Sequence, residues 1–280
     1  SRRRLRGHDH FPGLRPVASP GDRSLPEPGG LSEYSAGPPG DALVLYARVP
    51  RRGQVKTRMT PWLSADEAFR LHLALLEDSL ALLRAGAAAA GATPCLAFSE
   101  PWAPAGGGEG FAALATAAAG LARLPQRGGD LGERLRDTFT TLAAAGRRHV
   151  VVIGCDSPTL PPEILRSAFA ALRQEAEVVL GPAADGGYYL VGAARPVPEI
   201  FTGIPWSTDR VMEATLAALD RARVRAFLLP LWYDVDVPAD LDRLRADLVP
   251  PGPGAGKTAA FIDDLLRQGR LPCRAPRAPA

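Results

Sequence analysis

Three things are scarce in this chain of 280 residues: cysteine, long apolar runs and, away from its two ends, positive charge. The three cysteines (Cys95, Cys155 and Cys273) lack metal-site spacing and cannot all pair, which favours a reducing cytoplasm. No run approaches the roughly 18 apolar residues of a membrane-spanning helix. The N-terminal arginines are not followed by the apolar stretch of a secretory signal. We therefore expect a cytoplasmic protein without a membrane span.

The formal net charge of +3 is concentrated at the ends of the chain. Residues 1–40 carry a surplus of two positive charges and residues 250–280 a surplus of three, so residues 41–249 have a net charge of −2. We therefore expect no general basic surface for nucleic acid. Residues 1–40 are rich in Pro, Gly, Ser and Arg and predict a disordered extension. Residues 250–280 indicate a linker, a short amphipathic helix over 257–268 and a tail.

Between these ends, apolar segments of strand length alternate with segments of helical periodicity. This alternation predicts a three-layer α/β domain with a parallel or mixed sheet. The expected strands are 42–47, 93–98, 149–154, 177–182, 188–191 and 226–232. The expected helices begin after the capping box at Ser64 and then cover about 111–119, 131–145, 161–172, 209–222 and 238–248. His72 and Asp78, on the first helix, are expected to have only surface or packing roles.

The central strand of this domain leads to the first candidate site residue. Residues 150–153 form an apolar, largely β-branched run, typical of a strand buried in a parallel sheet. Gly154, Cys155 and Asp156 follow it. A carboxylate just beyond such a strand lies where open α/β sheets bind ligands. Asp156 is therefore a candidate site residue, although an aspartate here can also serve only as a turn or cap residue.

A basic loop follows the first strand. Residues 48–58 hold five basic residues and a glycine, at the position where α/β sheets bind phosphate. Arginine suits bidentate phosphate contact, and lysine acts as a point charge. The alternative is a solvated basic loop. The candidate phosphate-binding residues are Arg52, Gly53, Lys56, Thr57 and Arg58.

Two further segments combine turn chemistry with carboxylates. Residues 184–192 contain Asp185, Gly186 and Gly187 before a strand-like run, which indicates a plain hairpin or the lining of a sugar or base pocket. The late strand at 226–232 is followed by Asp234 and Asp236. A glycine-rich turn at 126–135 could also let the backbone approach a ligand closely.

Several of these segments, in this order, resemble one family. It is the rSAM/selenodomain-associated transferase 1 family, which belongs to the GT-A-like nucleotide-diphospho-sugar transferases. The similarity covers about residues 41–270, with a departure at Met59, where leucine is expected. The matching segments are 46–50, 53–58, 126–135, 154–160, 181–190, 206–208 and 234–236.

The resemblance implies a GT-A fold over residues 41–249, with a Rossmann-like nucleotide half followed by an acceptor half. It implies that Asp156 and Asp236 bind Mg²⁺ (or Mn²⁺), with Asp234 as a rival for the second position. The basic loop would bind the nucleotide phosphates. The implied catalytic residues are Asp156, Asp185 and Lys56, and the implied acceptor-binding residues are Gly186, Gly187, Tyr188 and Ser207.

The implied activity is transfer from a nucleotide-activated donor, an NTP or a nucleotide sugar, to a small-molecule acceptor. Nucleotidyl transfer expels pyrophosphate from an NTP, and glycosyl transfer expels a nucleoside diphosphate from a nucleotide sugar. The composition of the basic loop slightly favours a triphosphate donor. A nucleotide-binding accessory protein that has lost catalysis is the alternative. The sequence does not indicate the base, the sugar, the acceptor or the oligomeric state.

Overall fold

A computed structural model of the protein describes residues 39–99, 109–248 and 255–270. Almost all of the predicted N-terminal extension, the predicted linker and Cys273 lie outside the described residues. None of the helices in the described part combines the length and apolar character that crossing a bilayer requires.

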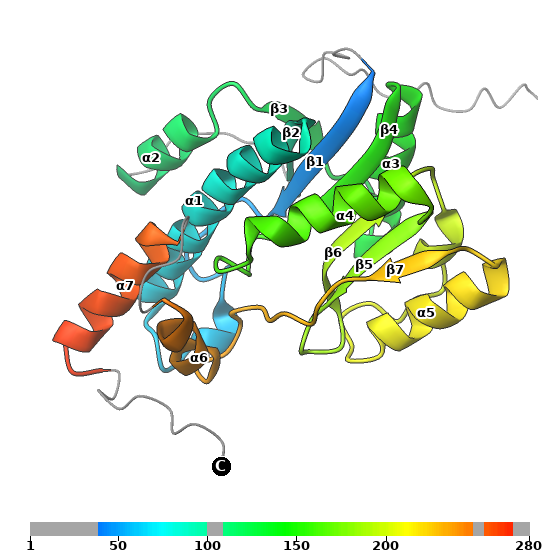
Figure 1. Cartoon of the computed structure of the whole chain (residues 1–280). Helices are drawn as coiled ribbons and strands as arrows, with labels where there is room; N and C mark the ends of the chain where they lie inside the picture. Colours follow the sequence, from blue (N-terminus) through cyan, green and yellow to red (C-terminus); the bar gives the residue numbers. More distant parts are fainter. Residues whose placement is uncertain (1–38, 100–108, 249–254, 271–280) are drawn as a thin grey trace, which may run out of the picture. The chain divides into compact units, whose positions relative to one another are not determined.

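The described residues form one mixed sheet with the strand order β3-β2-β1-β4-β6-β5-β7 (Figure 1). β6 runs antiparallel to both of its neighbours, and the other pairs are parallel. The sheet is therefore mixed, as predicted, and the segment around Asp185 is the turn of the β5–β6 hairpin. The strands are β1 (Gly40–Ala47), β2 (Ala92–Phe98), β3 (Ala122–Pro125), β4 (Arg147–Ile153), β5 (Val178–Pro182), β6 (Tyr188–Ala193) and β7 (Ala226–Leu228).

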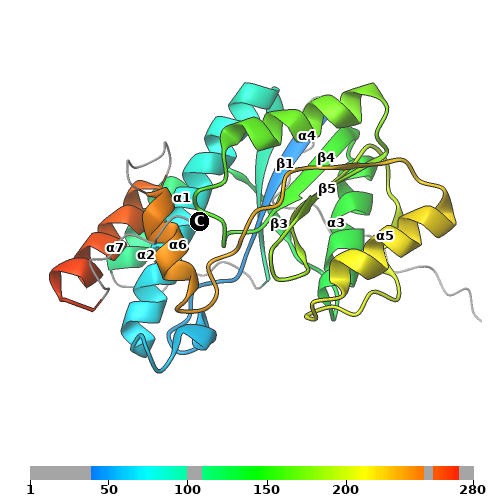
Figure 2. The same ribbon diagram turned by 60° about the horizontal axis from the view of Figure 1, so that its bottom comes forward.

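Helices cover both faces of the sheet (Figure 2). The first face packs against α1 (Ala65–Ala90), α2 (Glu109–Ala117) and α4 (Pro162–Gln174). The second packs against α3 (Leu131–Ala144), α5 (Val211–Ala222) and the 3₁₀ helix η2 (Pro198–Phe201). A third apolar cluster joins α1, the 3₁₀ helix η1 (Thr57–Met59), α6 (Asp240–Asp247) and α7 (Gly256–Arg267).

The central strands are apolar throughout because both of their faces are buried. In β1, Leu43 and Leu45 contribute to the first core, and Ala42 and Val44 to the second. Alternate side chains of a strand point to opposite faces, so a strand between two helical layers needs an uninterrupted apolar run. This is the pattern from which the sequence predicts β1 and β4.

The first helix begins where the sequence predicts. The Ser64 hydroxyl accepts a hydrogen bond from the Glu67 backbone N–H, and the Glu67 carboxylate accepts one from the Ser64 backbone N–H. This reciprocal capping satisfies two N–H groups that a helix leaves unpaired at its start. Gly91 ends the helix in a left-handed conformation, with φ of 65°.

Two strands differ from the prediction. β3 is absent from the predicted set because it has only four residues, including Arg123 and Pro125, and pairs on one side with β2. β7 spans three residues rather than seven. Beyond it, Trp232 bonds from its N–H to the Pro182 carbonyl at 3.0 Å, so the chain continues beside β5 without forming a regular strand.

Candidate active site

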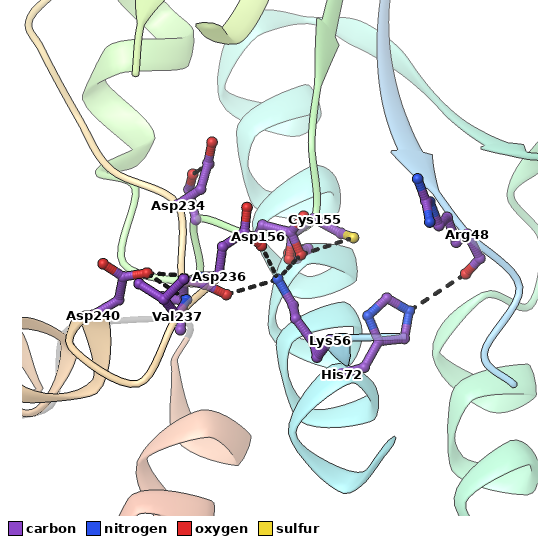
Figure 3. Close-up of polar contacts among 12 residues, drawn as sticks. Arg48, Lys56, His72, Cys155, Asp156, Asp234, Asp236, Val237 and Asp240 are labelled. Carbon is purple, nitrogen blue, oxygen red and sulfur yellow. Dashed lines mark hydrogen bonds and ion pairs between the residues drawn. The ribbon is translucent and has the colours of Figure 1, made fainter. Parts of the chain in front are cut away.

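Three loops meet beyond the carboxyl ends of the strands, and one lysine joins them (Figure 3). The Lys56 Nζ lies 2.6 Å from Asp156 Oδ1 and 2.9 Å from Asp236 Oδ1, and donates to the Val235 carbonyl at 2.7 Å. The Lys56 side chain is only 4% exposed, whereas each of the two aspartate side chains is 36% exposed. The acids therefore remain partly open to solvent, while the ammonium is enclosed. We call Lys56, Asp156 and Asp236 the ammonium bridge.

The backbone holds the two acids in place. The Val235 N–H donates to the Asp156 carbonyl at 2.8 Å, which ties the loop after β4 to the loop after β7. The Asp240 carboxylate, at the start of α6, accepts from the backbone N–H groups of Asp236 and Val237, both at 2.8 Å. Asp236 is thus fixed from two sides, by the β4 loop and by α6.

The charges of the ammonium bridge stabilise one another. Burial by itself would raise the pKa of Asp156, but the nearby Lys56 ammonium outweighs it and holds that pKa below its ordinary value. Burial would lower the pKa of Lys56, but the charges of Asp156 and Asp236 outweigh it and raise that pKa. Asp156 and Lys56 are therefore both ionised at neutral pH.

Asp234, the rival for the second position, has a different environment. Its carboxylate accepts a hydrogen bond from the Ser157 hydroxyl at 2.6 Å. Burial raises the pKa of Asp234 to about 7, helped by the charges of Asp156, Asp236 and Asp185 and opposed by the Ser157 hydrogen bond. In this arrangement Asp236, rather than Asp234, shares a cation with Asp156.

Two residues that the sequence analysis did not select also lie at Asp156. Ligand atoms of His72, Cys155 and Asp156 all lie within 4.8 Å of one another, close enough to hold a metal ion. Burial lowers the pKa of His72 and raises that of the Cys155 thiol, which donates to Asp156 Oδ1 at 3.7 Å. The His72 Nδ1 is buried without a partner among the described residues. A lone histidine on the apolar face of the first helix was the available signal.

The ammonium bridge fits a divalent cation as well as a lysine. One atom, the Lys56 Nζ, contacts an oxygen of each aspartate, so a single cation at that point reaches both carboxylates. Carboxylate oxygens are the ligands that Mg²⁺ and Mn²⁺ prefer, with water and phosphate oxygens completing the coordination. The donor atoms therefore suit the implied metal, but Lys56 takes the position between them.

The other predicted phosphate-binding residues do not reach the two acids. Arg52 forms an ion pair with Asp66 on α1, and its guanidinium lies 5.0 Å from the centre of the Phe69 ring. Thr57 and Arg58 are exposed in η1. Gly53, also exposed, has a left-handed φ of 71° that glycine adopts without strain. The basic loop thus presents one buried cation to the acids and keeps the others at its surface.

The predicted acceptor residues lie in and around the β5–β6 turn. The exposed Asp185 carboxylate accepts from the Gly187 N–H at 2.9 Å. Gly186 has a φ of 89°, and a Cβ there would lie 2.1 Å from the Asp209 carbonyl oxygen, so only glycine fits. The Tyr188 ring meets Trp206 edge-on, with ring centres 6.2 Å apart. Ser207 is exposed with a left-handed φ of 63°.

Comparison with known proteins places the chain in a family. The family model described as an uncharacterized protein conserved in bacteria (DUF2064) matches residues 82–208. A crystal structure from Desulfovibrio desulfuricans G20, provisionally assigned as a nucleotide-diphospho-sugar transferase, is 30% identical with a TM-score of 0.71. The match covers 81% of this chain and 97% of that chain. This chain therefore belongs to the same family, and the predicted GT-A-like fold is confirmed.

More distant solved structures match as well. One is CMP:2-keto-3-deoxy-manno-octonic acid synthetase complexed with CTP, at 14% identity, covering 76% of this chain and 99% of that chain, with a TM-score of 0.44. Another is a manganese complex of a protein from Mycobacterium tuberculosis H37Rv, at 18% identity, covering 74% and 97%, with a TM-score of 0.41. A search of curated protein sequences gives no match.

Proposed function

We propose that this protein is a metal-dependent transferase that uses a nucleotide-activated donor, with nucleotidyl transfer from an NTP favoured slightly over glycosyl transfer. The observation that carries the proposal is the pair of carboxylates after β4 and β7 that share one cation. The pair lies at the ligand-binding edge of the sheet, next to a loop with five basic residues. The sequence resemblance to rSAM/selenodomain-associated transferases supports the same reading.

In this proposal Asp156 and Asp236 hold Mg²⁺ or Mn²⁺. When bound, the metal neutralises the negative charge of the donor phosphates and of the leaving group. Lys56 and the surface cations of the basic loop supply further positive charge, with Arg52, Gly53, Thr57 and Arg58 contacting the phosphates. Such a site works mainly by positioning the reactants and stabilising developing charge.

The acceptor then occupies the side of the site formed by the β5–β6 turn. Gly186 lets the turn pack against Asp209, Gly187 lets the acceptor approach the backbone closely, and Tyr188 and Ser207 shape that side of the site. Asp185 is exposed and near enough to Asp234 to affect its ionisation. We assign Asp185 the role of a base that accepts a proton from the attacking acceptor hydroxyl.

A screen of NTPs and nucleotide sugars tests the proposal. We expect Mg²⁺-dependent thermal stabilisation of the wild-type protein by at least one donor. In turnover assays, release of pyrophosphate would identify nucleotidyl transfer, and release of a nucleoside diphosphate would identify glycosyl transfer. A protein that binds nucleotide in isothermal titration but releases neither product would be the accessory protein instead.

The matched variants are Asp156→Asn and Asp220→Asn. Asp156→Asn keeps the side-chain shape and removes one charge, so we expect a folded protein without Mg²⁺-dependent nucleotide binding or turnover. Asp220 is an exposed acid on α5, outside the ammonium bridge, and its variant should behave as wild type. Near-wild-type activity in Asp156→Asn would contradict the proposal and reduce Asp156 to a turn residue.

A further inference from the structure

Lys56 is held in the ammonium bridge more firmly than a surface lysine would be. Its three N–H donors face three acceptors: one oxygen of Asp156, one oxygen of Asp236 and the Val235 carbonyl. The side chain is 4% exposed. The ammonium therefore has no donor left for water or for a phosphate while it stays in this position.

The backbone supports the same inward placement. Lys56 has a left-handed conformation, with φ of 49° and ψ of 37°, which is unfavourable for a residue with a side chain. The neighbouring Val55 is buried in the first core, and Met59 is buried against α1, α6 and α7. The conformation is thus imposed by anchors on both sides, and it directs the lysine towards the acids (Figure 3).

We propose that Lys56 and a divalent metal compete for the single position between Asp156 and Asp236, so that metal enters the site only together with a phosphate-bearing donor. The proposal deepens the proposed function and rests on it. Two cations cannot share one point between two carboxylates, because their repulsion would be strong at such short range. An ammonium leaving this enclosed position needs another anion, and the phosphates of the donor provide one.

The competition makes metal and donor bind cooperatively. Metal alone displaces Lys56 from both carboxylates and supplies no anion in their place. Metal that arrives with phosphate displaces Lys56 onto the phosphate oxygens, so each ligand lowers the cost of binding the other. In this view Lys56 offsets part of the negative charge of the acid pair between turnovers and becomes a phosphate ligand during them.

The test measures binding of Mn²⁺ alone to the full chain, from the electron paramagnetic resonance signal of the free ion. Wild type should bind Mn²⁺ weakly. Lys56→Met removes the competing charge at similar length, and should bind Mn²⁺ at least about tenfold more tightly. Lys257→Met removes the charge of a largely exposed lysine outside the ammonium bridge, and should bind Mn²⁺ as wild type does.

Two double variants locate the metal that Lys56→Met gains. Adding Asp236→Asn should abolish the gain, because it removes half of the acid pair. Adding Cys155→Ser should leave the gain intact. If the gain depends on Cys155 and not on Asp236, the metal is bound at His72, Cys155 and Asp156, and the proposal is wrong.

Other outcomes also decide the question. Equal Mn²⁺ affinity in wild type and a folded Lys56→Met protein would overturn the competition. If Lys56→Met does not fold, Lys56→Gln replaces it. Tight binding of Mn²⁺ to the wild-type protein without nucleotide would by itself overturn the proposal, and this measurement needs no variant. Because no nucleotide is present, these results stand apart from the donor screen. A protein that binds no nucleotide would refute the proposed function and leave the Lys56–metal competition measurable.

Discussion

Two clusters of charged side chains lie at opposite ends of the same two strands, β1 and β4. At the amino ends, Asp41 accepts from Arg173 at 2.6 and 2.8 Å and lies 2.8 Å from His149 Nδ1. At the carboxyl ends, Lys56 faces Asp156 and Asp236, with Asp234 nearby. The first cluster surrounds one acid with two basic residues, whereas the second places one buried ammonium between two acids, with a third acid close to them.

The difference separates a structural cluster from a binding site. Asp41 is 6% exposed, both of its oxygens are engaged, and the adjacent Arg173 guanidinium would repel a further cation. Asp156 and Asp236 have side chains 36% exposed, and negative charge exceeds positive charge around them. Excess charge of one sign at a partly open position is costly for folding, and it is expected where a charged ligand will compensate it.

The largest effect should come from the Asp41 cluster. Asp41→Asn removes the anion that three basic nitrogens face, and we expect it to lower the free energy of unfolding by about 2–3 kcal/mol. Urea denaturation at neutral pH would measure the loss. Nucleotide binding by the folded protein should not change, because the cluster lies at the opposite end of the strands.

The pH dependence sharpens this expectation. Burial would raise the pKa of Asp41, but the hydrogen bonds from Arg173 and His149 hold it below its ordinary value. A depressed folded-state pKa contributes stability above the unfolded-state pKa, and this is lost as the pH falls through the folded-state value. The difference between wild type and Asp41→Asn should therefore be largest near neutrality and shrink in acid. A difference that grows in acid would contradict the assignment.

An intermediate effect is expected at Asp78, a buried acid that belongs to neither cluster. The sequence suggests only a surface or packing role, but Asp78 is 3% exposed and its carboxylate accepts from the backbone N–H groups of Lys257 and Thr258 at 3.0 and 2.7 Å. It therefore caps the start of α7. Asp78→Ala should cost about 1–2 kcal/mol by leaving two helix N–H groups unpaired.

Limited proteolysis would locate that loss. Freed from its cap, α7 should be cleaved from the rest of the chain faster in Asp78→Ala than in wild type. Glu77→Gln is the matched control, since Glu77 pairs with the largely exposed Lys257 side chain at 3.2 Å and its loss should cost less. If the two variants were cleaved equally fast, the capping role of Asp78 would be wrong.

The sequence predicts most of the fold because buried strands and capped helices leave local patterns. The run at 150–153 and the capping box at Ser64 are examples, and both elements form as predicted. β3 could not be predicted, since its four residues show no period and pair on one side only with β2. The sequence also leaves two interpretations of residues 184–192 open, because the same turn chemistry fits a plain hairpin and the lining of a pocket.

For the site, the sequence predicts which residues lie at the edge of the sheet. It does not predict where their side chains point. Asp156 and Asp236 follow strands, so their place at the sheet edge could be predicted from topology. The five basic residues of the loop look alike in the sequence, yet only Lys56 reaches the acids. That choice depends on a left-handed residue between two buried anchors. The approach of His72 to Cys155 depends on how α1 packs, which no local pattern encodes.

The smallest effect on stability is expected for Arg52 and Asp66, which form an ion pair at the surface, unlike the two more buried clusters. Its side chains are 62% and 72% exposed, so solvent screens the charges and already hydrates both partners. Arg52→Ala should change the free energy of unfolding by no more than about 0.5 kcal/mol. Its nucleotide affinity should fall less than that of Arg58→Ala, because Arg52 would have to leave Asp66 and the Phe69 ring to reach a phosphate. Paired urea and nucleotide titrations would check both statements. A loss of several kcal/mol in stability would show that the Arg52 contact with Phe69 matters more than its exposed charge.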